Sequence, residues 1–206
     1  MFPAKADLLQ NMTGLLGNVA EVPQLRPRLM TKEFVEEVAD LLVPRQEGME
    51  VSHNAAGVLA HLASDGAAAW TIKEPDREDV LERLGRAITR WDIGASRNIT
   101  YWSFAPLLSL ARQSSTPQCQ MWAVWALANL TSVTPEKHCS LLLQEGGLAL
   151  MEDLLQQNCE EVRDWAGLVK NNLLHSQQQS GQSGTEEIRH INRLQQLLGD
   201  IISRVQ

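Results

Sequence analysis

The stretch Met121-Trp122-Ala123-Val124-Trp125-Ala126-Leu127-Ala128-Asn129-Leu130 is the most informative part of this sequence. On a helix Trp122, Trp125 and Asn129 share one face, because they recur at spacings of three and four. The alanines between them let neighbouring helices approach closely. Small residues mixed with large aromatics are typical of a helix that is enclosed on several sides. The stretch therefore predicts a central buried helix that carries a polar side chain near its end.

A related phrase occurs twice more, in Leu15-Leu16-Gly17-Asn18-Val19-Ala20 and Val58-Leu59-Ala60-His61-Leu62-Ala63. The phrases align with Asn18, His61 and Asn129 in register. The first interval, 43 residues, has the length of a HEAT or armadillo repeat, whereas the second, 68 residues, indicates an expanded or irregular repeat. Such units bury their apolar faces only by stacking on one another. We predict an all-α, armadillo/HEAT-like helical solenoid.

The aligned polar residues are candidate peptide ligands. In armadillo arrays the last helix of each unit lines a concave groove, where an asparagine can hold a peptide backbone by two hydrogen bonds. Asn18, His61 and Asn129 fit this role. The structural alternative is that each side chain forms a bond at a helix end or between helices. Three more candidates for the same surface are Ser52, Asn54 and Tyr101.

Composition excludes several classes of function. The chain has 206 residues, 44% of them hydrophobic, and a net charge of −7. This length suffices for one sizeable domain or a short array. An acidic chain is a poor match for nucleic acid, which needs a basic stripe. No apolar run approaches the ~20 residues of a membrane span, and residues 1–7 do not resemble a signal peptide.

The cysteines and histidines predict neither catalysis nor metal binding. Cys119, Cys139 and Cys159 are an odd number without paired spacing, which favours reduced thiols and a protein of the cytoplasm or nucleus. His138 and Cys139 are adjacent, but no second close pair completes a zinc site. No glycine-rich nucleophile turn is visible. We predict a protein that is not an enzyme and has no cofactor.

Helical spacing and capping residues divide the chain into further elements. A first helix is predicted over Lys5–Glu21, a helix that fills the expanded interval over Asn98–Arg112, and a last repeat helix over Glu160–His175. Terminal repeats normally carry a polar cap, and the first helix has none. The chain thus resembles the C-terminal part of a longer array, unless Met1–Ala4 cover the end themselves.

Three segments follow from this pattern. Residues 1–176 form the repeat domain and residues 177–184, rich in Gln, Ser and Gly, a flexible linker. Residues 185–206 form an amphipathic tail helix with the apolar seam Ile191, Leu194, Leu198, Ile201 and Val205. Docking of this tail on the solenoid and binding of a partner are both open.

Several motifs resemble the zyg-eleven/zer-one family. They are Gly14-Leu15-Leu16-Gly17-Asn18-Val19-Ala20-Glu21-Val22, Ser52-His53-Asn54-Ala55-Ala56-Gly57-Val58-Leu59-Ala60-His61, Trp91-Asp92 with Asn98-Ile99-Thr100-Tyr101-Trp102-Ser103-Phe104, Trp122-Ala123-Val124-Trp125-Ala126, and Cys139-Ser140-Leu141-Leu142 with Glu145-Gly146-Gly147. The match runs from about Leu8 to Leu155, and the tail lies outside it.

The resemblance implies a substrate receptor of Cullin-2 RING ubiquitin ligases. In that family an armadillo-like domain binds proteins that begin with unacetylated glycine or another small residue, and other regions contact the Cullin-2/Elongin complex. The family's asparagine and glutamate, three residues apart on one groove helix, match Asn18 and Glu21. An α-amino group is a cation with three donors, so a carboxylate and an amide oxygen suit it.

One part of the family pattern is missing from these 206 residues. The resemblance implies an upstream Trp-Asn-x-x-Asp motif that closes the pocket around the ammonium group, and the chain contains no Trp-Asn pair. Either the chain is a fragment or it has lost half of the pocket, and its affinity for glycine should be weak. The alternative function is a scaffolding solenoid that binds partners through its tail or convex face.

Overall fold

The computed structural model describes residues 3–43, 48–97, 99, 101–179 and 193. Secondary structure within these residues is helical, without a strand. The elements are α1 (Pro3–Glu21), η1 (Pro23–Leu25), α2 (Arg26–Leu29), α3 (Lys32–Asp40), α4 (Met49–Ser64), η2 (Ala67–Ala69), α5 (Arg77–Ile88), α6 (Ala105–Ala111), α7 (Pro117–Val133), α8 (Pro135–Gln144) and α9 (Gly147–Leu154), followed by helical residues 160–179.

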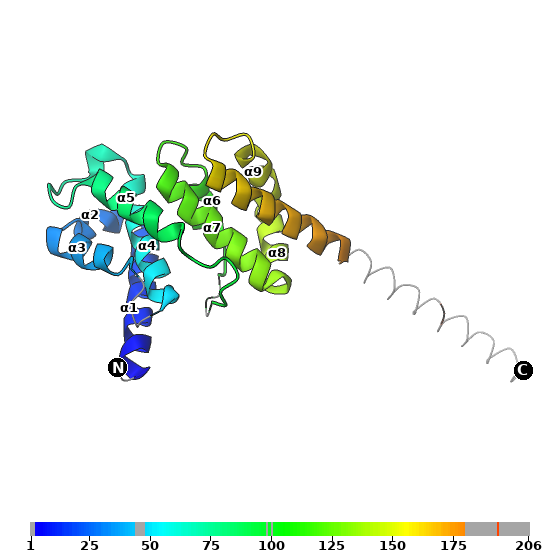
Figure 1. Cartoon of the computed structure of the whole chain (residues 1–206), viewed down its shortest axis with the longest axis horizontal. Coiled ribbons are helices and arrows are strands. Elements are labelled where there is room, and N and C mark those ends of the chain that lie inside the picture. The colour runs from blue at the N-terminus through cyan, green and yellow to red at the C-terminus, as the bar shows by residue number, and fades with distance from the viewer. Residues whose placement is uncertain (1–2, 44–47, 98, 100, 180–192, 194–206) are drawn as a thin grey trace, which may run out of the picture.

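The long helices pack side by side along the array (Figure 1). α1 contacts α4, and α4 contacts α7. Asn172, in helical residues 160–179, donates from Nδ2 to Thr131 Oγ1 of α7 over 3.1 Å. The shorter helices lie between the four long ones, which are α1, α4, α7 and the helix of residues 160–179. The predicted all-α solenoid is confirmed. No helix in the described part of the chain is long and apolar enough to cross a membrane.

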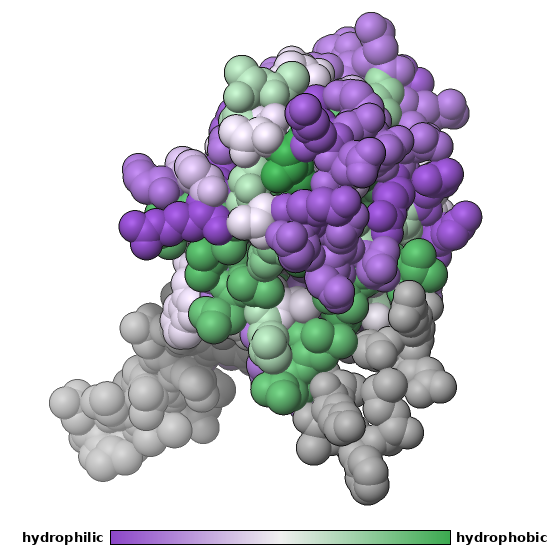
Figure 2. All heavy atoms as spheres, turned by 90° about the vertical axis from the view of Figure 1, so that its left-hand side faces the viewer, coloured by the Kyte–Doolittle hydropathy of each residue, from purple (hydrophilic) through white to green (hydrophobic). Residues whose placement is uncertain are grey.

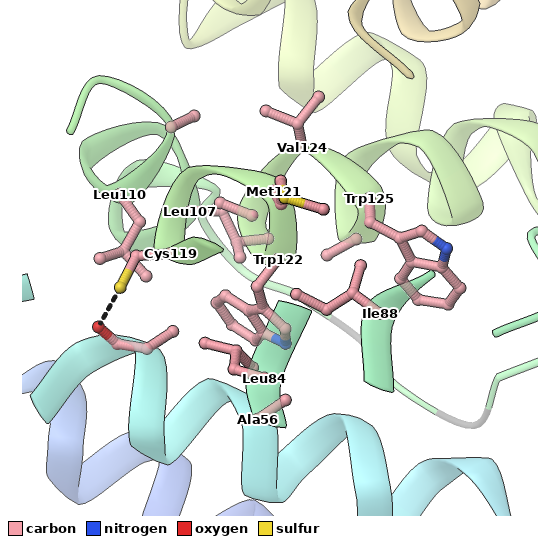
Figure 3. Packing of buried hydrophobic residues seen from close by; sticks show 14 of the residues in the cluster. Ala56, Leu84, Ile88, Leu107, Leu110, Cys119, Met121, Trp122, Val124 and Trp125 are labelled. Carbon is pink, nitrogen blue, oxygen red and sulfur yellow. Dashed lines mark hydrogen bonds between the residues drawn. The ribbon is translucent and has the colours of Figure 1, made fainter. Parts of the chain in front are cut away.

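α7 is the central helix of the core, as its sequence predicts. Every residue from Cys119 to Thr131 is buried. Figure 3 shows the indoles of Trp122 and Trp125 among apolar side chains between α7 and its neighbours. Two bonds join α7 to α4: the Cys119 thiol donates to Ala60 O over 3.2 Å, and Trp122 Nε1 donates to His53 O over 3.2 Å.

Local capping explains where several helices begin. The hydroxyl of Thr31 accepts the Phe34 N–H over 3.3 Å at the start of α3. Asp76 accepts the Asp79 N–H over 2.8 Å at the start of α5. Such bonds satisfy backbone donors that have no partner within the helix.

The helix predicted over Asn98–Arg112 is wrong in its first half. α6 begins only at Ala105, and the described residues between Arg97 and Ala105 are not helical. The Phe104 N–H is held by the Glu145 carboxylate over 2.6 Å, and Phe104 itself is fully buried. Tertiary contacts thus override the helix-like spacing of the aromatics. The expanded interval is filled mainly by the connection between α5 and α6.

The predicted linker and tail are described only in part. Residues 177–179 are helical, so the repeat helix includes the first three residues of the predicted linker. Glutamine, which occupies all three positions, is a good helix former. Residues 180–184 and the tail helix over 185–206 lie outside the described residues, apart from Arg193, which is helical.

The outward face of α1 is apolar and exposed. Leu8, Met12 and Leu15 recur at spacings of four and three, and each keeps more than half of its surface in water. In Figure 2, which views the molecule from the left-hand side of Figure 1, hydrophobic side chains gather on the lower part of this face. α1 therefore packs mainly against α4, with smaller contacts to η1 and α2, and leaves this face exposed.

Candidate functional site

A polar cavity of about 610 Å³ lies between α1 and α4. Five residues of the chain from Ile99 to Pro106, together with Trp122 of α7, complete the lining. The lining residues are Gln10, Asn11, Gly14, Gly17, Asn18 and Glu21 from α1, Glu50, His53, Asn54, Gly57 and His61 from α4, and Ile99, Tyr101, Trp102, Ser103, Pro106 and Trp122.

Five of the seven predicted site residues line this cavity, and two do not. The five are Asn18, Glu21, Asn54, His61 and Tyr101. Ser52 is buried, where its hydroxyl donates to Leu42 O over 2.6 Å and accepts from Trp91 Nε1 over 3.2 Å. Asn129 is 0% exposed. The structure thus corrects the expected placement of Ser52 and Asn129, which are held inside the protein.

Asn18 and Glu21 lie one turn apart at the end of α1, so they project on the same side. Asn18 is exposed and Glu21 half-buried. Burial raises the pKa of the Glu21 carboxyl above its ordinary value. Among the described residues, the Glu21 carboxylate has no hydrogen bond or ion pair, which leaves it able to accept a cation.

Arg26 fixes the end of α1 that carries this pair. Its guanidinium donates from Nε to Ala20 O over 2.7 Å and from Nη2 to Glu21 O over 3.3 Å. It also forms an ion pair with Asp65, just beyond the end of α4. One buried cation therefore satisfies the last carbonyls of α1 and joins the two helices that form the cavity.

Two neutral histidines form the floor. His53 and His61 are both buried, and their ring nitrogens have no hydrogen-bond partner. Burial, and then the charge of Arg26, lower the pKa of His61 to about 3. Burial, and then Arg97, lower the pKa of His53 well below its ordinary value. The His53 ring lies among three indoles, with centroid distances of 5.2–5.5 Å to Trp122, Trp91 and Trp125.

Glu50 and Tyr101 also line the cavity, and Arg97 lies behind them as the ion-pair partner of Glu50. Arg97 binds Glu50 in a fork, from Nε over 3.3 Å and from Nη2 over 3.0 Å. Burial raises the pKa of Tyr101 to about 12; Arg97 opposes the rise, and the charges of Glu21 and Glu50 add to it. The phenol therefore stays protonated at neutral pH and lies within electrostatic range of the Glu21 carboxylate.

The glycines of the lining have different surroundings. A Cβ on Gly57 would lie 2.7 Å from the Trp122 ring, so only glycine lets the indole pack on α4 here. A Cβ on Gly17 would meet no atom within 4 Å. Packing of Trp122 thus requires glycine at position 57, whereas the lack of a side chain at Gly17 leaves open space in the cavity.

The repeat register extends to a residue that the sequence analysis did not assign. Asn172 follows Asn129 by 43 residues, the interval that separates Asn18 from His61. Its amide donates to Thr131 Oγ1 over 3.1 Å and to Ser132 Oγ over 3.0 Å. Extending the first interval beyond Asn129 was the signal that could have found it.

Among the described residues there is neither a cysteine with a lowered pKa nor a cluster of metal-ligand side chains. Burial raises the pKa of Cys119 to about 12 and also raises that of Cys139, whereas a nucleophilic cysteine needs a lowered value. Within the described residues, no group of three or more His, Cys, Asp or Glu side chains could hold a metal ion.

Comparison with known proteins identifies the family. The family "Protein zer-1 homolog-like, C-terminal domain" matches residues 1–176. The chain belongs to this family. It is 53% identical over 198 residues to the Protein zer-1 homolog of Drosophila melanogaster, covering 82% of this chain and 25% of that protein. It is 40% identical over 174 residues to the Zyg eleven-related protein 1 of Caenorhabditis elegans, and this match covers 84% of this chain and 19% of that protein.

The chain thus spans about a fifth to a quarter of the length of these zer-1 relatives. Among solved structures, a designed armadillo repeat protein matches 80% of this chain and 58% of its own at 19% identity, with a TM-score of 0.34. The family resemblance inferred from the sequence motifs is confirmed.

Proposed function

We propose that the cavity binds the N-terminal residue of another polypeptide through its free α-amino group. The observation that carries this proposal is the half-buried Glu21 carboxylate, which has no ion pair among the described residues and lies beside Asn18. A buried carboxylate is stabilised by a cation that also donates hydrogen bonds. An α-ammonium group supplies one charge and three donors, and Asn18 offers it a neutral acceptor.

Selection of a small first residue is expected from the aromatic part of the lining. Tyr101 and Trp122 line the same cavity as Glu21, and Trp122 fills the space above Gly57. A large side chain next to the bound amine would meet these rings. We therefore expect a preference for glycine, followed by other small residues, in the unacetylated form.

In the longer family members, this domain would select substrates for a Cullin-2 RING ubiquitin ligase. Proteins with an exposed N-terminal glycine would be its clients, and regions outside this chain would contact the Cullin-2/Elongin complex. The family membership of residues 1–176 supports this proposal. The chain alone should bind weakly, because these 206 residues lack the Trp-Asn-x-x-Asp motif whose aspartate would also contact the ammonium group. We expect a Kd of about 0.1–1 mM, which corresponds to a binding free energy of about −4 to −5.5 kcal/mol.

The test is a titration of isotope-labelled protein with a hexapeptide that begins with free glycine, followed through the indole N–H signals of Trp102 and Trp122. Acetylation of the peptide should abolish binding. Glu21→Gln should weaken it about 10- to 100-fold, because a charge-assisted hydrogen bond contributes about 1.5–3 kcal/mol. Glu37→Gln, which removes an exposed carboxylate of α3 outside the cavity lining, is the matched control and should bind like the wild type.

Two outcomes separate this function from scaffolding. Equal binding of acetylated and free peptides would refute amine recognition and favour the scaffolding alternative. The pH profile gives a second criterion: affinity should fall as acid protonates Glu21, whose pKa is raised, and again above about pH 8, where an α-amino group loses its proton. A flat profile would count equally against the proposal.

A further inference from the structure

The repeat register shows that the concave face is open on two helices and closed on the third. Three aligned positions recur at intervals of 43 and 68 residues: Asn11, Gly14 and Asn18 on α1, Asn54, Gly57 and His61 on α4, and Trp122, Trp125 and Asn129 on α7. All positions on α1 and α4 line the cavity. On α7 only Trp122 does, so something else covers Trp125 and Asn129.

The cover is the chain's own segment Trp91–Arg97, which we call the blocking segment. The Trp91 ring packs against Trp125, with centroids 5.0 Å apart. Asn129 Nδ2 donates to Ile93 O and to Ala95 O, each over 2.9 Å. Asn129 thus binds two carbonyls of a single turn, in which the Ala95 N–H donates to Asp92 O over 3.2 Å, and its amide group is used within the chain.

Both ends of the blocking segment are anchored to α4. At its start, Trp91 Nε1 donates to Ser52 Oγ over 3.2 Å. At its end, the guanidinium of Arg97, only 1% exposed, forms the fork with Glu50. Ser52 and Asn129, which the sequence analysis assigned to a ligand, therefore bind this segment instead. The expanded repeat interval supplies the residues that form it.

We infer that the blocking segment determines specificity for a polypeptide end. It occupies the α7 part of the concave face, so a chain that lies across α1 and α4 has no path over α7. The cavity accepts a terminus and excludes the same residues in the middle of a chain. Asn129, Ser52 and Glu50 act as positioning residues through this segment. That the bound end is an amino terminus rests on the proposed function. That the blocking segment covers α7 does not depend on it.

The test compares two peptides on the wild type and on variants. One peptide begins with free glycine, and the other carries four alanines before that glycine. In wild type the extended peptide should bind at least 20-fold more weakly. Asn129→Ala removes both bonds to the segment and should reduce this ratio at least fivefold. Asn172→Ala is the matched control, since the side-chain amide of this aligned asparagine donates to Thr131 and Ser132 and not to the blocking segment. Its ratio should equal that of the wild type.

A second variant covers the case in which Asn129→Ala does not fold. Ile93 is a partly buried loop residue that packs on the core, so Ile93→Ser should loosen the segment and leave the helices intact. Hydrogen exchange measures the change: amides of residues 92–97 should exchange at least tenfold faster in both variants than in the wild type, while α4 amides should not change.

The outcomes separate the two proposals. If neither peptide binds the wild type, the proposed function fails. In that case the blocking role predicts that Asn129→Ala and Ile93→Ser gain binding of the extended peptide, and the absence of this gain overturns it. If the free peptide binds the wild type, a ratio that stays constant while residues 92–97 exchange faster overturns the blocking role. Equal binding of both peptides by the wild type overturns it too.

Discussion

α1 and α7 occupy equivalent places in the array, yet their surroundings are opposite. α7 is enclosed by α4, α5, α6 and α8, and even its concave side is covered by the blocking segment. α1 packs against α4 and exposes Leu8, Met12 and Leu15 on its other side. The proposed ligand residues Asn18 and Glu21 lie on the open helix. Stability is therefore concentrated in α7, and the accessible polar chemistry in α1.

The largest expected effect is a loss of stability in α7. Trp125→Ala should lower the free energy of unfolding by about 3–5 kcal/mol, because Trp125 is 1% exposed and its truncation leaves a cavity. Leu15→Ala on α1, at a side chain 64% exposed, should cost less than about 0.5 kcal/mol. Urea unfolding of both variants measures the difference. Equal losses would show that the two helices contribute alike.

Acid should destabilise the protein through the buried histidines of α4. His61 has a folded-state pKa of about 3 against about 6.5 unfolded, so the unfolded chain binds the additional proton and stability falls as the pH drops below about 6.5. At pH 5 this amounts to about 2 kcal/mol. His61→Leu keeps the volume and should lose about 2 kcal/mol less than the wild type between pH 7 and pH 5. Parallel curves in denaturant melts would contradict this.

Adding a methyl group at two of the lining glycines, one on α4 and one on α1, sharpens the comparison. Gly57→Ala should cost about 1–3 kcal/mol, because its Cβ would collide with the Trp122 ring that α7 inserts. Gly17→Ala on α1 should leave stability unchanged or raise it by up to about 1 kcal/mol, since a Cβ meets nothing and alanine favours the helix. Thermal melts at neutral pH report both signs. A destabilised Gly17→Ala would mean that α1 is packed more tightly than its surroundings indicate.

The smallest expected effect is that of Glu21→Gln on folding. Burial raises the pKa of Glu21, so above that pKa the ionised carboxylate disfavours the folded state, and the cost disappears in acid. The variant should match the wild type within about 0.5 kcal/mol at pH 7, or exceed it. A clear loss of stability would assign Glu21 a structural role and weaken its proposed role in binding.

The sequence predicts the repeat helices well because their periodicity follows from burial. It fails between Arg97 and Ala105, where Tyr101 and Phe104 have helical spacing but are held by tertiary contacts. The register of Asn129 was predicted, but its partner was not. Sequence spacing shows that an asparagine faces the concave side, whereas only the fold shows that Ile93 and Ala95 reach it first.

Trp102, on the rim of the cavity, gives the protein a built-in optical reporter. It is 91% exposed, whereas the other five tryptophans are buried or half-buried. A small quencher such as acrylamide would therefore dim this indole preferentially. An unlabelled peptide that settles against the rim would shield it and shift its emission to shorter wavelength, so occupancy can be followed on native protein in a cuvette.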